Sequence, residues 1–136
     1  IRFIGRRDRL SPKLLRLMTD MEERTAANER LDLFVAFDYG GRAEIVDACR
    51  RIVEDGLRPD EIDETAIRAR LAAAEVPDPD LVIRTSGEQR ISNFMLWHAA
   101  YAEYTFPDVL WPDFGAEELQ QAVGEFATRR RRFGGR

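Results

Sequence analysis

Two arginines and a serine with the chemistry to hold a diphosphate follow a short apolar stretch. Arg84 and Arg90 flank the small-residue turn 85–87, and Ser92 stands two residues further on. A guanidinium group offers a planar fork of donors that matches phosphate oxygens, and small residues let backbone N–H groups approach an anion. Two such forks and a hydroxyl suit a diphosphate better than a lone carboxylate.

Acidic residues downstream offer ligands for a metal ion. A bound diphosphate normally brings Mg²⁺, which takes carboxylate oxygens and waters. One of Glu103, Asp108 and Asp113 is therefore a candidate magnesium ligand. The same pattern also fits a salt-bridged surface loop in which Glu88 pairs with a flanking arginine. The residues taken alone leave both interpretations open.

Strand-like and helix-like segments alternate along the chain. Short apolar runs predict strands at 2–5, 31–37, 80–85 and 104–106. Helical spacing of apolar residues predicts helices within 10–29, 38–56, 57–76 and 115–133, with a helical turn or two within 93–104. This alternation indicates an α/β fold with a parallel sheet.

The apolar stripes predict which side chains face inward. Each stripe follows the spacing that puts residues on one face of a helix. The predicted inward residues are Leu14, Met18 and Met21 in the first helix, Ile45, Val46, Cys49, Ile52 and Val53 in the second, Ile67 and Leu71 in the third, and Leu119, Val123 and Phe126 in the last.

The predicted sheet also places the candidate site. Ligands of open parallel sheets sit outside the carboxyl ends of the strands. Arg84 and the turn 85–87 occupy that end of one predicted strand, and residues 38–41 (Asp-Tyr-Gly-Gly) occupy the same end of another. We therefore expect both glycine turns to line one crevice.

Length and charge narrow the class of protein. The 136 residues suit one domain or a piece of one, and the small number of strands with an abrupt strand-like start favours a piece. A net charge of −4 gives the chain no general attraction to nucleic acid or anionic lipid. The longest purely apolar run, 33–37, is too short to span a membrane. We expect a soluble chain.

Cysteine use points to a reducing compartment. The single cysteine, Cys49, excludes an intramolecular disulfide and a multi-cysteine metal site. Because Cys49 falls on the apolar stripe of a predicted helix, we expect a buried, inert thiol. These features predict a cytoplasmic protein.

At this point the residues resemble a known family. The stretch "DLVIRTSGEQRISNFMLW", followed by "AYAEYTF" and "VLWPDF", is similar to a block of the cis-prenyltransferases, the undecaprenyl or polyprenyl diphosphate synthase type. The stretches "FDYGGRAEIVDA" and "RRFGG" match other family blocks in the right order. The resemblance runs over essentially the whole chain and implies the parallel-sheet sandwich of that family.

The resemblance implies an activity and its ligands. Such enzymes condense isopentenyl diphosphate with an allylic diphosphate, form a Z double bond, use Mg²⁺ and form homodimers. Carried over by position, Arg84, Arg90, Ile91 and Ser92 would bind the isopentenyl diphosphate, the Ile91 backbone included, and Glu103 would be the metal-linked glutamate. The tail residues Arg132 and Gly134 would reach the diphosphate site of the partner subunit. The lipid product implies a peripheral association with the inner face of the plasma membrane.

Two positions depart from the family pattern. His98 stands where the family commonly has glutamine, and Gln89 stands where some members have histidine. We expect His98 to be a packed or hydrogen-bonded histidine, with no proton-transfer or metal role assigned at either position. Asp113 belongs to a recurring block and receives no catalytic role.

The family's opening block is absent from the printed sequence. That block ends in a His-x-Met-Asp-Gly-Asn type loop whose aspartate binds Mg²⁺ with the allylic diphosphate. We therefore expect residues 1–136 to be the C-terminal part of a single cis-prenyltransferase domain that lacks the first strand and helices, with no catalytic residue in this chain. The alternative is a non-catalytic subunit of a heteromeric cis-prenyltransferase. Product length stays open.

Overall fold

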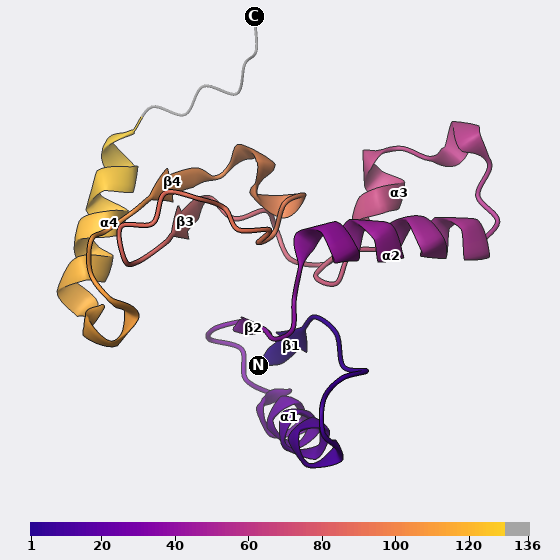
Figure 1. Cartoon of the computed structure of the whole chain (residues 1–136), viewed down its shortest axis with the longest axis horizontal. Coiled ribbons are helices and arrows are strands. Elements are labelled where there is room, and N and C mark those ends of the chain that lie inside the picture. The colour runs from indigo at the N-terminus through magenta and orange to yellow at the C-terminus, as the bar shows by residue number, and fades with distance from the viewer. Residues whose placement is uncertain (130–136) are drawn as a thin grey trace, which may run out of the picture. The chain divides into compact units, whose positions relative to one another are not determined.

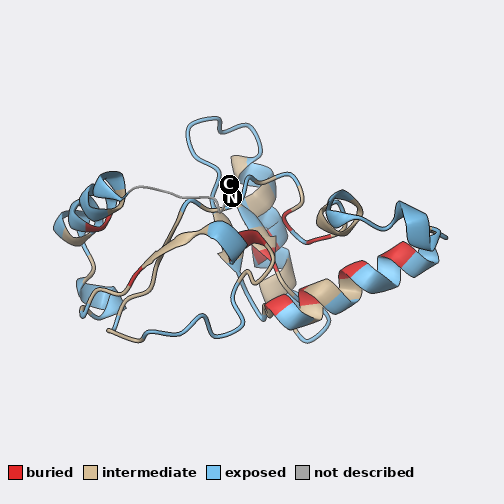
Figure 2. Cartoon of the chain, turned by 90° about the horizontal axis from the view of Figure 1, so that it is seen from above, coloured by how far each residue is buried: buried red, intermediate tan, exposed pale blue. Residues whose placement is uncertain are grey.

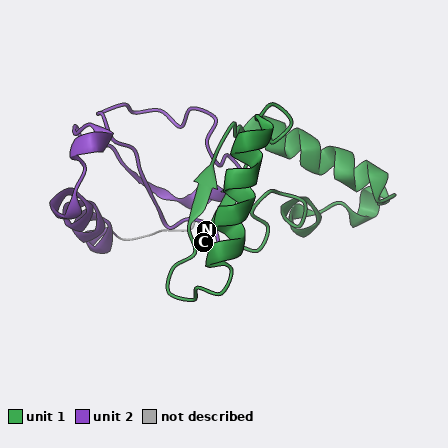
Figure 3. Cartoon of the chain, turned by 90° about the horizontal axis from the view of Figure 1, so that it is seen from below, with its two compact units in different colours: residues 1–76 green, residues 77–136 purple. Residues whose placement is uncertain are grey.

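The computed structural model describes residues 1–129 and divides the chain into two compact units (Figures 1 and 3). Unit 1 is Ile1–Val76 and unit 2 is Pro77–Arg136. Each unit contains one pair of parallel strands. The prediction that the chain is part of a single domain stays a prediction, and each unit is described separately.

Unit 1 contains a parallel strand pair and three α-helices. Its elements are β1 (Arg2–Ile4), α1 (Pro12–Thr25), β2 (Phe34–Ala36), α2 (Gly41–Glu54) and α3 (Glu64–Arg68), with a 3₁₀ turn at Pro59–Glu61. The register pairs Arg2 with Phe34 and Ile4 with Ala36. Parallel strands need a long crossover connection, which is usually a helix, and α1 is that helix here. The predicted order of elements is confirmed in this unit.

Unit 2 contains the second strand pair and one long helix. Its elements are β3 (Leu81–Ile83), β4 (Glu103–Thr105) and α4 (Ala116–Thr128), with 3₁₀ turns at His98–Tyr101 and Trp111–Asp113. The register pairs Leu81 with Glu103 and Ile83 with Thr105. The predicted α/β character and parallel pairing are therefore confirmed.

The first helix begins where the Ser-Pro signal predicts. The Ser11 hydroxyl accepts a hydrogen bond from the Leu14 N–H at 3.3 Å, and Pro12 occupies the first helical turn. Proline suits this position because its missing N–H would have no partner inside the helix. Residues 12–25 therefore start from a side-chain cap.

Replacing Ser11 by alanine is expected to lower the free energy of unfolding by about 1 kcal/mol, because one helical N–H loses its acceptor. Urea denaturation of the chain, followed by circular dichroism, measures this loss. Ser11→Asp is the matched control, since an aspartate also caps. Equal stability of Ser11→Ala and Ser11→Asp would contradict the capping role.

The second helix buries a different face from the predicted one. Its buried positions are Gly41, Glu44, Ala48 and Ile52 (red along α2 in Figure 2). Of the predicted stripe, Val46 is 49% exposed, Val53 is 78% exposed and Cys49 is exposed. The prediction of a buried Cys49 thiol is therefore wrong.

The physical reason is a buried carboxylate that the apolar pattern ignores. Glu44 accepts hydrogen bonds from the Tyr39 hydroxyl and from the Ala72 N–H, the latter at 3.0 Å. These bonds compensate the burial of its carboxylate. The residues one and two turns further on, Ala48 and Ile52, are then buried on the same side of α2.

The other stripes are confirmed only in part. Met18 is 3% exposed, but Met21, Leu119 and Val123 are 45%, 46% and 49% exposed, so their predicted inward positions are wrong. Leu71 is buried, yet it lies beyond the end of α3, which is only five residues long. Among residues 1–129 no helix is both long and apolar enough to cross a membrane.

Candidate diphosphate site

Arg84 lies at the carboxyl end of β3 and reaches across the loop that follows. Its backbone N–H donates to the Thr105 carbonyl at 2.9 Å, which extends the pairing of β3 with β4 by one residue. Its Nη1 donates to the Arg90 carbonyl at 2.5 Å and to Ser92 Oγ at 2.8 Å. The Arg84 guanidinium group therefore holds the loop that carries the other candidate residues.

A small cavity lies where these residues meet. It has a volume of about 280 Å³, and its lining includes Arg84, Arg90, Ile91 and Ser92, the four residues predicted to bind isopentenyl diphosphate in this part of the chain. The rest of the lining is largely apolar: Val82, Ile83, Thr85, Phe94 and Tyr104. The fold thus combines a cationic, hydroxyl-bearing edge with an apolar wall in one cavity.

The alternative of a salt-bridged loop is correct for one arginine. Arg90 forms an ion pair with Glu88, and their side chains are 63% and 40% exposed. An ion pair this exposed is worth little, about 0 to 1 kcal/mol, so an anion competes with it at low cost. The Arg90 guanidinium is therefore available to a ligand, while Arg84 is anchored to the loop.

Two N–H groups of the turn 85–87 are bonded within the chain. The Ser86 N–H donates to the Val109 carbonyl at 2.7 Å, and the Gly87 N–H donates to the Pro107 carbonyl at 3.0 Å. The expectation that small residues here let backbone donors approach an anion is therefore wrong for these two residues. The predicted contacts of Arg84, Arg90, Ile91 and Ser92 with a diphosphate stay a prediction.

Glu103 is paired with an arginine. Its Oε2 lies 3.1 Å from Arg129 Nη1, which also donates to the Tyr104 carbonyl at 2.8 Å. The Glu103 side chain is 32% exposed, and no group of three potential metal ligands occurs among residues 1–129. A single accessible carboxylate fits Mg²⁺ only where phosphates and waters supply the other ligands, which is common for this ion.

Four other positions singled out in the sequence have no demonstrated role. Asp113 is exposed in the 3₁₀ turn Trp111–Asp113, and Gln89 is exposed in the loop after β3. Arg132 and Gly134 lie outside the described residues, so their predicted reach to a partner subunit stays a prediction. The same holds for Mg²⁺ and the homodimer.

His98 is packed, as predicted. It is 1% exposed, and neither ring nitrogen finds a partner among the described residues. A buried polar group without a partner costs free energy that an apolar side chain would not. We therefore expect the buried histidine at position 98 to lower the free energy of unfolding.

Replacing His98 by leucine is expected to raise the free energy of unfolding of the chain by about 1 kcal/mol, because two unsatisfied nitrogens are removed from the interior. Chemical denaturation measures the change. His98→Gln is the matched control, since its amide would again be buried, and it should give no such gain. A clear loss of stability in His98→Leu would show that the imidazole has a partner.

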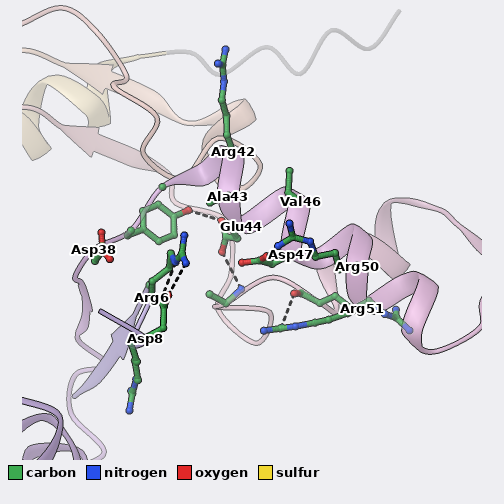
Figure 4. A pocket seen from close by; sticks show the side chains of 16 residues that line it. Arg6, Asp8, Asp38, Arg42, Ala43, Glu44, Val46, Asp47, Arg50 and Arg51 are labelled. Atoms are coloured by element: carbon green, nitrogen blue, oxygen red, sulfur yellow. Dashed lines mark hydrogen bonds and ion pairs between the residues drawn. The ribbon is translucent and has the colours of Figure 1, made fainter. Parts of the chain in front are cut away.

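A second cavity lies in unit 1, with a volume of about 620 Å³. Three residues of the stretch 38–41, Asp38, Tyr39 and Gly40, are among its lining residues. Figure 4 shows ten of its 16 lining residues by label. The charged ones are Arg6, Arg7, Asp8, Asp38, Arg42, Glu44, Asp47, Arg50, Arg51 and Arg70.

Two of the arginines that line this cavity are paired with acids that also line it. Arg6 donates to Asp8 at 2.7 and 3.1 Å; the hydrogen bond and the charge of Asp8 raise the pKa of Arg6, and the hydrogen bond from Arg6 lowers the pKa of Asp8. Arg50 pairs with Asp47 at 2.8 Å. The sequence analysis did not single out the buried Glu44. The available indication was its position as an acidic residue in the first turn of a helix, where a negative charge is favoured. The expectation that both glycine turns line one crevice stays a prediction.

Comparison with known proteins shows the family. The model of the prenyltransferase family described as "Putative undecaprenyl diphosphate synthase" matches residues 1–134. Isoprenyl transferase 2 of Bradyrhizobium diazoefficiens is 50% identical over 139 residues, covering 99% of this chain and 55% of that protein. A relative from Xanthomonas axonopodis pv. citri, named ditrans,polycis-undecaprenyl-diphosphate synthase ((2E,6E)-farnesyl-diphosphate specific), is 49% identical, with 98% and 54% covered.

A solved structure of a prenyl diphosphate synthase has a similar fold. The chain is similar to lavandulyl diphosphate synthase from Lavandula x intermedia, solved in complex with dimethylallyl diphosphate. The TM-score is 0.93, the identity is 39%, and 98% of this chain and 59% of that chain are covered. The chain thus spans about half the length of the curated relatives it matches. The match of the family model to residues 1–134 and these similarities show that the chain belongs to the undecaprenyl diphosphate synthase family of prenyltransferases.

Proposed function

We propose that this chain is the C-terminal part of a cis-prenyltransferase and supplies the site for isopentenyl diphosphate. The observation that carries the proposal is the cavity of unit 2, in which Arg84, Arg90 and Ser92 meet. The family of the chain and the names of its relatives support a reaction between two prenyl diphosphates.

The composition of the cavity supports isopentenyl diphosphate as the ligand. Its cationic edge suits the diphosphate, since charge-assisted hydrogen bonds from arginine are about twice as strong as neutral ones. Its apolar wall, which includes Ile83, Phe94 and Tyr104, suits a five-carbon chain. A cavity of about 280 Å³ is small for a long polyprenyl chain and is of the size expected for a small ligand.

In the proposed reaction this chain holds the nucleophile. Arg84 and Arg90 neutralise the diphosphate of isopentenyl diphosphate and fix its direction, so that its double bond faces the allylic carbon. Fixing two reactants in this way supplies a large share of the rate enhancement. Mg²⁺, when bound, would stabilise the charge that grows on the leaving diphosphate, and Glu103 is the carboxylate of this chain that would hold it.

The Glu103–Arg129 pair makes a metal role for Glu103 testable. Replacing Arg129 by methionine in the full-length protein is expected to tighten Mn²⁺ or Mg²⁺ binding about two- to fivefold, because the ion no longer competes with an exposed ion pair. Electron paramagnetic resonance of Mn²⁺ measures the affinity. Arg50→Met, which breaks a more exposed pair with Asp47, is the control, and Glu103→Gln should abolish the effect. Equal affinity in wild type and Arg129→Met would count against Glu103 as the ligand.

The reaction itself is tested with purified full-length protein, isopentenyl diphosphate and Mg²⁺. Farnesyl diphosphate and dimethylallyl diphosphate are the allylic substrates to test. Farnesyl diphosphate appears in the name of a relative, and dimethylallyl diphosphate is bound in a similar structure. We expect a longer prenyl diphosphate with Z double bonds, identified by mass spectrometry and NMR. Activity only after addition of a second, different chain would instead establish the heteromeric alternative.

The proposed protein acts as a homodimer at the cytoplasmic face of the membrane. This part of the proposal rests on the family of the chain and on a lipid product that partitions into the bilayer. Sedimentation of the full-length protein, with and without vesicles that contain the product, tests both statements.

A further inference from the structure

Tyr104 lies at the centre of β4, on the face of the strand pair that carries Arg84 (β3 and β4 in Figure 1). The register places Tyr104 opposite Val82. Side chains two positions apart lie on one face of a strand, so Val82 and Arg84 share that face. The bond from the Arg84 N–H to the Thr105 carbonyl continues the pairing to Arg84. Because Tyr104, Val82 and Arg84 all line the cavity of unit 2, the Tyr104 ring belongs to the wall beside Arg84.

Two contacts hold the Tyr104 side chain in place. Its ring stacks on the Phe106 ring, with 6.1 Å between the centroids and 13° between the planes, which is typical of a stacked aromatic pair. Its hydroxyl donates to the Ala99 carbonyl at 3.3 Å. Ala99 does not line the cavity, so the hydroxyl is bonded outside it and the apolar ring is the part that faces a ligand.

The other apolar side chains of the lining are less suited to fix the size of the cavity. Phe94 and Ile91 belong to the loop after β3 and are 41% and 46% exposed. Exposed side chains change rotamer within nanoseconds, so these two can move aside for a larger ligand. Val82 and Ile83 lie on β3, but their side chains are smaller than that of Tyr104. Tyr104 is therefore the large side chain of this wall that a paired strand holds.

We infer that Tyr104 determines which homoallylic diphosphate the site accepts, an inference that rests on the proposed function. Isopentenyl diphosphate is the homoallylic substrate with a methyl branch. With its diphosphate held by Arg84, Arg90 and Ser92, its carbon chain lies against the Tyr104 ring. A longer branch meets the ring, and adding a methylene to a filled apolar site costs free energy. Tyr104 is thus a specificity-determining residue, and the arginines bind the charge.

The first test uses the wild-type protein. The probe is 3-ethylbut-3-enyl diphosphate, which carries an ethyl group where isopentenyl diphosphate carries a methyl group. The assay contains the full-length protein, an allylic diphosphate and Mg²⁺. We expect kcat/KM for the analogue to be about 10- to 200-fold lower than for isopentenyl diphosphate, the range for one added methylene in an apolar pocket. Equal kcat/KM for the two substrates would overturn the inference.

The second test removes the ring. Tyr104→Val keeps a residue that suits a strand. It is expected to bring the two kcat/KM values closer together by about tenfold or more, because the added methylene no longer meets the ring. This ratio compares two substrates of one preparation, so a loss of folded protein does not change it. An unchanged ratio in Tyr104→Val would overturn the inference.

Two controls accompany this variant. Tyr104→Phe keeps the ring and loses only the hydroxyl, and Tyr101→Val makes the same substitution at a residue that is 74% exposed and does not line the cavity. Both are expected to keep the wild-type ratio within about threefold. A change in Tyr101→Val as large as that in Tyr104→Val would count against the inference, and so would a Tyr104→Phe variant that accepts the analogue as well as Tyr104→Val does.

Binding of inorganic diphosphate separates this inference from the proposed function, because this probe has no carbon chain. In isothermal titration of the full-length protein, Arg84→Gln is expected to weaken binding about tenfold or more, and Tyr104→Val should stay within about threefold of wild type. If Arg84→Gln binds like wild type, the proposed function fails and this inference fails with it. If Arg84→Gln weakens binding but Tyr104→Val keeps the wild-type selectivity, only the inference fails. Equal weakening in both variants would place Tyr104 in the anion site and would also overturn the inference.

Discussion

Replacing Arg84 by alanine in the full-length protein is expected to raise the KM for isopentenyl diphosphate about ten- to a hundredfold, with a smaller effect on kcat. This corresponds to about 1.5 to 3 kcal/mol, the range for hydrogen bonds to charged groups. The structure gives two reasons. The variant loses a guanidinium group at the cavity. It also loses the hydrogen bonds that Arg84 donates to the Arg90 carbonyl and the Ser92 hydroxyl.

Two further variants show which part of Arg84 matters. Arg84→Lys keeps the charge but loses the planar fork, so it should recover only part of the affinity. Arg58→Ala, which removes an exposed arginine paired with Asp60 in unit 1, should leave the KM unchanged. The assignment is refuted if Arg84→Ala shows the KM of the wild type, or if Arg58→Ala raises the KM as much.

The second large effect is a complete loss. The purified 136-residue chain is expected to show no prenyl transfer with isopentenyl diphosphate, an allylic diphosphate and Mg²⁺. Residues 1–136 contain no stretch of the His-x-Met-Asp-Gly-Asn type, to which the family resemblance assigns the allylic diphosphate, and the chain spans about half the length of its relatives. The assay is incorporation of labelled isopentenyl diphosphate into an organic-soluble product. The full-length protein in the same buffer is the positive control, and product from the purified chain alone would contradict the expectation.

Strand and turn signals predicted the elements that position the site. The apolar run before Arg84 is β3, and the register of β3 with β4 places Ile83 opposite Thr105, so that Arg84 emerges at the strand end as expected. The convergence of Arg84, Arg90 and Ser92 around one cavity agrees with the residue pattern. Short-range patterns sufficed here because the residues concerned lie within one loop.

Features that depend on contacts distant in sequence were not predictable from the residue pattern. The buried face of α2 follows from the bond between Glu44 and the Ala72 N–H, 28 residues away. A pattern of apolar residues cannot indicate that a carboxylate is buried and hydrogen-bonded. It therefore predicted the wrong buried face of α2, the one that includes Cys49. Similarly, the residue pattern predicted that the N–H groups of Ser86 and Gly87 are available to an anion, because their acceptors, the Val109 and Pro107 carbonyls, lie at least 20 positions further along the chain.

The central claim is that the cavity of unit 2 binds the diphosphate of isopentenyl diphosphate. A crystal structure of the full-length protein with isopentenyl diphosphate tests it most directly. We expect diphosphate oxygens at hydrogen-bond distance, about 2.7 to 3.2 Å, from the side chains of Arg84, Arg90 and Ser92. The Arg90–Glu88 pair should open at the same time. A diphosphate bound elsewhere, with Arg90 still paired to Glu88 and no ligand beside Arg84, would contradict the claim.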